Sequence, residues 1–126
     1  MFKNPLSAYQ AVEQATVSGR ATEARVLTKA AMMLKDCQNQ WDSYTKRKRL
    51  HDAIEYNQRI WSIIQAALLE EDNPLPKKTR VDLLTLSAYI DKRMFDVLAF
   101  PSPEKLSIII DINLNIAAGL RSQGAE

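Results

Sequence analysis

The sequence is poor in the residues that make tight turns, cross-links and phosphate-binding loops. Only three glycines and one cysteine, Cys37, occur among 126 residues. A single cysteine excludes an internal disulfide, and so few glycines leave little material for a Gly-rich phosphate loop. No apolar run approaches the ~20 residues that cross a bilayer, and the first ten residues carry no apolar stretch typical of a secretory signal. We therefore expect a cytoplasmic protein without a membrane partner.

The composition is that of an ordinary globular domain. Hydrophobic residues make up 46% of the chain and charged residues 25%, which is close to the average for soluble domains. A chain of this length forms one domain, and we assign residues 1–126 to it. The net charge of +2 is too small to imply a nucleic-acid or membrane partner by itself.

Apolar residues recur at spacings of three and four along most of the chain, which is the period of an α-helix. Start and stop residues divide this pattern into five helices. The first begins at Asn4-Pro5 and ends at Ser18-Gly19, and the second begins near Thr22 and ends around Asp42-Ser43. The third contains the densest stripe, residues 50–68, and ends before Asn73. The fourth runs from Pro76 to Phe100, with an apolar face made of Val81, Leu84, Ala88, Met94, Phe95 and Leu98.

The last segment is ambiguous from its pattern alone. Its isoleucines alternate with mostly polar residues from Ile108 to Ile116, which is a strand period, but the same residues also fit a helical stripe. We prefer a helix because Ser102-Pro103-Glu104 is a strong helix start, Gly119 suits a C-terminal cap, and no other segment offers a partner strand. The predicted fold is therefore all-α, a single-domain antiparallel bundle of about five helices.

Few residues offer chemistry. His51 is the only histidine, and its neighbour Asp52 should point in a different direction, because adjacent residues on a helix do not face each other. Cys37 lies on an apolar stripe, where core packing is the better interpretation of a thiol. No catalytic motif accompanies them. We expect no enzymatic activity, no cofactor and no metal site.

A run of four cations, Lys46-Arg47-Lys48-Arg49, has two interpretations. It could neutralise a few phosphates and so support weak, salt-sensitive contact with RNA. Only one aromatic residue, Tyr44, lies near the run, and no known nucleic-acid motif accompanies it. Alternatively the run caps the preceding helix, where cations favour the helix dipole.

Helix surfaces and one turn supply the remaining candidates for a partner contact. Tyr56, Asn57, Arg59 and Trp61 sit together on the third helix, and Asn57 interrupts its apolar stripe, as Asn113 does on the last helix. Each asparagine either contacts a partner or tethers a neighbouring segment inside the domain. In the turn Asn73-Pro74-Leu75-Pro76, Leu75 either plugs the end of the bundle or contacts a partner together with Arg80.

These residues also carry a resemblance to a known family. The segments Tyr56-Asn57-Gln58-Arg59-Ile60-Trp61 and Asn73-Pro74-Leu75-Pro76, then Arg80, Ile112-Asn113 and residues 116–120, resemble the FlaF regulators of flagellar biosynthesis. The stretch containing Lys29-Ala30-Ala31, Leu34 and Trp41 does so too. No single motif is specific, but the ordered series spans nearly the whole chain.

The resemblance implies a cytoplasmic helical protein that promotes flagellin synthesis or secretion, in opposition to the FlbT repressor, and that acts as a flagellin chaperone. The expected partners are flagellin, FlbT and the flagellar export apparatus, and the free protein is expected to be a monomer. The alternative is a post-transcriptional regulator that touches flagellin mRNA through the cationic run. The candidate partner-binding residues are Tyr56, Asn57, Arg59, Trp61, Asn73, Leu75, Arg80, Asn113 and Ile116.

Overall fold

The computed structural model describes residues 5–42 and 46–125, and the side chains of residues 21–42 and 47–122. Within these ranges the chain forms four α-helices: α1 (Pro5–Asn39), α2 (Lys46–Leu68), α3 (Lys77–Ala99) and α4 (Leu106–Ala125). A short 3-10 turn, η1 (Pro103–Lys105), leads into α4. The described part of the chain contains no strand, so the predicted all-α fold is confirmed.

The helix count differs from the prediction because the first two predicted helices are one. Helix α1 is continuous for 35 residues, and the predicted end at Ser18-Gly19 is wrong. A glycine in a helix interior costs only ~1 kcal/mol relative to alanine, whereas a proline would remove a hydrogen bond and clash with the preceding turn. The first proline after Pro5 is Pro74, so nothing in this region forces the helix to stop.

The other helix ends agree more closely with the sequence signals. Helix α1 begins at Pro5, helix α3 begins one residue after Pro76, and the ambiguous last segment is helical. Gly119 is not the predicted C-terminal cap, because α4 continues to Ala125 and no described glycine has a positive φ. Glycine tolerates the helical conformation, so its presence did not mark an end.

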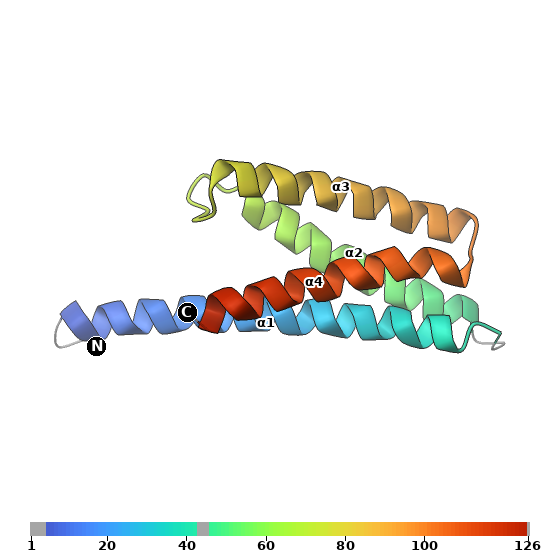
Figure 1. The fold of residues 1–126 in the computed structure, drawn as a ribbon, viewed down its shortest axis with the longest axis horizontal. Helices are drawn as coiled ribbons and strands as arrows, with labels where there is room; N and C mark the ends of the chain where they lie inside the picture. The colour runs from blue at the N-terminus through green and yellow to red at the C-terminus, as the bar shows by residue number, and fades with distance from the viewer. Residues whose placement is uncertain (1–4, 43–45, 126) are drawn as a thin grey trace.

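The helices pack side by side in a four-helix arrangement (Figure 1). Helix α4 runs along α1, and α1 also contacts α2. Helix α3 packs mainly on α2, on the side of α2 that faces away from α1. All four helices contribute side chains to one core, whose largest fully buried members are Trp61, Leu27, Leu34, Ile54, Ile90, Met94, Leu106 and Ile109. The N-terminal end of α1 extends beyond the other helices (Figure 1).

Helix α3 turns a different face to the core from the one predicted. Its buried residues are Ser87, Ile90, Met94 and Val97. Among the six residues predicted for its apolar face only Met94 is buried, Leu84 is half-buried, and the other four are exposed. The helix carries two stripes at helical spacing, and the local pattern could not distinguish which of them meets α2.

None of the described helices combines the length and the apolar character that a membrane span requires.

Candidate partner-binding site

A chain of hydrogen bonds in the core joins three of the helices. The Trp61 indole of α2 donates to Asn113 Oδ1 of α4 at 2.9 Å. Asn113 Nδ2 donates to Asn57 Oδ1 at 2.6 Å, and Asn57 Nδ2 points at Met94 Sδ of α3 at 3.1 Å. The indole can only donate, so it fixes the orientation of the Asn113 amide and then that of Asn57.

This polar chain accounts for both asparagines that interrupt apolar stripes. Asn57, Asn113 and Trp61 each have 0% exposure. Buried amides without partners cost ~1–3 kcal/mol each, and here the bond between the two amides, the indole and Met94 Sδ supply the partners. The structure therefore places three of the predicted partner-binding residues inside the fold, where they tie α2 to α4 and α3. In this arrangement a partner has no direct access to them.

Tyr56 and Arg59 lie nearer the surface of α2. Tyr56 is half-buried, with Lys29 Nζ of α1 5.2 Å from the centre of its ring. Arg59 is exposed and pairs with Glu55 one turn earlier, at 3.3 Å. The two residues are near each other in sequence, but they serve different sides of the helix. Of these two residues, Arg59 borders the shallow groove between α2 and α3, which is also lined by Asp91 and Phe95 of α3, and Tyr56 does not.

The turn between α2 and α3 is held from within by Asn73. Its Nδ2 donates to the Ala67 carbonyl near the end of α2 at 2.8 Å, and its Oδ1 accepts from the Leu75 amide at 3.0 Å. One side chain thus bonds both to a carbonyl in the last turn of α2, which also accepts from the Glu70 amide, and to an amide of the stiff segment between the two prolines. Arg80 contributes less: its Nη1 lies 3.4 Å from the Glu70 carbonyl, and its buried Nε has no partner among the described residues.

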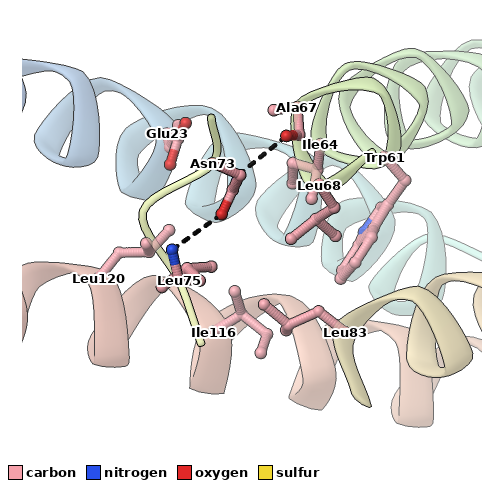
Figure 2. Close-up of a pocket in the computed structure, with 10 residues that line it drawn as sticks. All are labelled: Glu23, Trp61, Ile64, Ala67, Leu68, Asn73, Leu75, Leu83, Ile116 and Leu120. Atoms are coloured by element: carbon pink, nitrogen blue, oxygen red, sulfur yellow. Dashed lines mark hydrogen bonds between the residues drawn. The ribbon is translucent and has the colours of Figure 1, made fainter. Parts of the chain in front are cut away.

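Leu75 faces a small apolar pocket at this end of the bundle (Figure 2). The pocket has a volume of about 90 Å³, and Figure 2 shows Leu75 beside Ile116 and Leu120 of α4, with the Trp61 ring opposite. Four predicted site residues therefore line one pocket: Trp61, Asn73, Leu75 and Ile116. Leu75 and Ile116 are each half-buried, which fits the plug interpretation of Leu75.

The cationic run forms the first turn of α2 and not the last turn of α1. The cations therefore lie at the positive end of the α2 dipole, which is unfavourable for them, and contact with the end of α1 is made by the side chain of Arg49. Arg47, Lys48 and Arg49 are exposed, and the side chain of Lys46 lies outside the described residues. Arg49 donates a hydrogen bond to Gln40 Oε1, just past the end of α1.

Three exposed groups near the start of α2 come within reach of a single cation. His51 Nδ1 is 3.9 Å from Asp52 Oδ1 and 3.7 Å from Glu55 Oε2. The expectation that Asp52 points away from His51 is wrong at this distance. All three side chains are more than half exposed, so water competes for every ligand position, and exposed acidic groups are common without a metal.

Cys37 is buried in the core as predicted, with 5% exposure. Burial raises the pKa of its thiol, and nearby Arg49 opposes this rise only in part. A neutral buried thiol packs as a small apolar group and is a poor nucleophile.

A family model described as flagellar protein FlaF matches residues 5–120. The chain belongs to the FlaF family. The match covers all four helices apart from the last residues of α4, so it includes the buried polar chain and the Leu75 pocket of this FlaF chain. Searches among curated proteins and among solved structures found no match.

The sequence-based prediction missed the exposed apolar surface of this FlaF chain. Large apolar side chains lie exposed on α2, on α3 and in the segments that follow them, with Phe95 at 75%, Phe100 at 71% and Leu69 at 70% exposure. The sequence pattern assigned Phe95 to the core because its spacing is helical. The spacing of three and four between Phe95 and its apolar neighbours was the available signal. That spacing does not distinguish a helix face that packs in the core from one that contacts a partner.

Proposed function

We propose that this chain promotes flagellin synthesis and secretion as a cytoplasmic chaperone that binds flagellin, and that it acts by binding and not by catalysis. Membership of the FlaF family carries the proposal, since it makes the chain a flagellar protein. The exposed apolar side chains of α2 and α3 support a binding role. Amphipathic helices commonly bind by laying their apolar face into such a surface, which would keep unassembled flagellin from aggregating.

Calorimetry with purified flagellin tests the proposal. We expect a one-to-one complex with a heat of binding at tens of micromolar protein. The negative heat-capacity change of buried apolar surface should accompany it. No detectable binding under these conditions would contradict the chaperone role.

A second candidate is a post-transcriptional regulator that contacts flagellin mRNA, acting with or against FlbT. The exposed cations in the first turn of α2 favour it, because no acidic residue accompanies them in that turn. RNA binding across a salt series tests it, with Lys46, Arg47, Lys48 and Arg49 changed together to Ala. Affinity that is unchanged by the substitutions would eliminate this surface as the RNA contact. A pull-down with FlbT alone would identify the third arrangement, in which FlbT contacts the RNA and this chain binds FlbT.

A further inference from the structure

Helix α3 carries a second stripe of mostly apolar residues that the described part of the chain covers only in part. Its members follow one another at spacings of three, four, three, four and three, and we call them the α3 seam: Val81, Leu84, Ala88, Asp91, Phe95 and Leu98. The large apolar members remain accessible, with Val81 at 50%, Phe95 at 75% and Leu98 at 44% exposure. The face buried against the bundle is a separate set, centred on Ile90 and Met94.

This spacing is the one that pairs two helices along their length. In a heptad, positions alternately three and four apart form the seam that inserts into a facing helix. The seam drifts by only ~20° per heptad on a straight helix, so two and a half heptads stay on one face. From Val81 to Leu98 the seam extends ~26 Å, at ~1.5 Å per residue. It therefore fits one helix of about five turns.

The charges beside the seam select the partner. Lys78 and Lys92 lie two heptads apart on one edge, at positions that separate a seam from solvent, with Thr85 between them. Neither lysine has an ion pair with any described residue. Acidic residues at the facing edge of a partner helix would pair with them, and such pairs set partner choice and orientation.

Asp91 gives the seam a polar position among apolar ones. Gln65 of α2 donates to its carboxylate at 3.0 Å, which holds the group in place. Asp91 and Phe95 also border the shallow groove between α2 and α3. A polar residue within a seam specifies register, so the partner should present a cation or a hydrogen-bond donor at the matching position.

A second copy of the chain is a poorer occupant in the antiparallel arrangement, by the same argument. A two-fold dimer places the same patch of both subunits together. In an antiparallel pair of α3 helices, the Lys78–Lys92 edge would meet itself, and that edge carries no acidic residue to pair with the lysines.

We propose that the α3 seam binds one amphipathic helix of flagellin, about five turns long, with an apolar seam, an acidic edge facing Lys78 and Lys92, and a cation or donor opposite Asp91. This inference rests on the proposed chaperone function and adds the surface that performs it.

Binding of purified flagellin to full-length variants tests the seam. Phe95→Asp should weaken binding at least about thirtyfold, as expected for a central aromatic anchor. The matched control is Ile63→Asp, because Ile63 is an apolar residue of α2 with 62% exposure and does not border the groove. The control should stay within about twofold of wild type, and both variants should melt at the wild-type temperature. Lys92→Glu, a charge reversal at an exposed position, should weaken binding several-fold at low salt and less at high salt.

The outcomes are distinguishable. If Phe95→Asp and Lys92→Glu bind flagellin as well as the wild type does, the α3 seam is not the binding site and the chaperone function still holds. Wild type that does not bind would overturn both. Sedimentation equilibrium in which wild type is a dimer and Phe95→Asp a monomer would assign the seam to a second copy and overturn the flagellin assignment.

Discussion

Trp61 contributes to stability through its volume and through its indole N–H. It has 0% exposure, and its donor satisfies Asn113. Trp61→Ala should lower the free energy of unfolding by about 3–5 kcal/mol, because a buried large aromatic leaves a cavity. Trp61→Phe keeps most of the apolar contact and removes the donor, so its cost should be nearer ~1–3 kcal/mol. Urea denaturation measures both values, and a wild-type midpoint for Trp61→Ala would contradict the buried placement.

The burial of Cys37 predicts a slow reaction of its thiol and a loss of stability at alkaline pH. The native thiol should react with a thiol reagent much more slowly than the thiol of the urea-unfolded chain, because burial raises its pKa. The unfolded thiol keeps the ordinary pKa of 9.0, so the unfolded state loses its proton first. The free energy of unfolding should therefore be unaffected by this group below that pH and fall as the pH rises above it.

Cys37→Ser should remove that alkaline dependence at a modest cost in stability. Motility should remain normal, because the thiol packs and does not react. Loss of motility at normal protein level and normal melting temperature would contradict this assignment.

At the residue scale, the sequence predicted which faces of α2 and α4 turn inward. Helical spacing alone indicates that Trp61 and Asn113 share faces with apolar residues. It could not show that Asn57 and Asn113 meet, since they are 56 positions apart and a local period contains no information on pairing between helices. The two interpretations of each asparagine could be separated only by the packing of α2 against α4.

At the element scale, the turn between α2 and α3 makes a sharp prediction. Leu75→Asp places a carboxylate in an apolar pocket and removes part of a half-buried leucine, which should lower the free energy of unfolding by about 2 kcal/mol. The matched control is Leu69→Asp, in the same connection but 70% exposed, which should leave the melting temperature nearly unchanged. Thermal unfolding followed by circular dichroism measures both.

The competing role of Leu75 has a different signature. A Leu75→Asp variant that melts normally but no longer retains flagellin would make Leu75 a partner contact and not a plug. A variant that melts normally and also binds flagellin normally would contradict both interpretations.

Prolines predicted helix starts better than glycines predicted helix ends. Proline restricts φ and lacks an amide, so Pro5, Pro76 and Pro103 marked the beginnings of segments to within a residue or two. Glycine only permits an end. Gly19 and Gly119 both lie within helices, because packing of the flanking turns can outweigh the ~1 kcal/mol that a glycine costs.

At the scale of the whole molecule, the helices should differ in local stability. Helices α1 and α4 share the most extensive packing, whereas α3 lies mainly against α2. Amide hydrogen exchange should therefore be faster along α3 than at the centres of α1 and α4, since sub-global opening releases the least-packed element first. Bound flagellin should slow exchange in α3 if the seam is its site. Equal protection of all four helices in the free protein would contradict this order.

The continuous α1 helix also determines how the protein moves through solution. Its 35 residues span ~52 Å at ~1.5 Å per residue, whereas a sphere with the ~14 Å radius of gyration of a compact chain this long is only ~36 Å across. A molecule with such a long axis experiences more friction than a sphere of equal mass. It should diffuse slowly and leave a gel-filtration column early, at the volume of a heavier globular standard. A mass calculated from the elution volume would then be too high and would suggest a dimer for a monomer. Light scattering measures the mass independently of shape and would give the correct value.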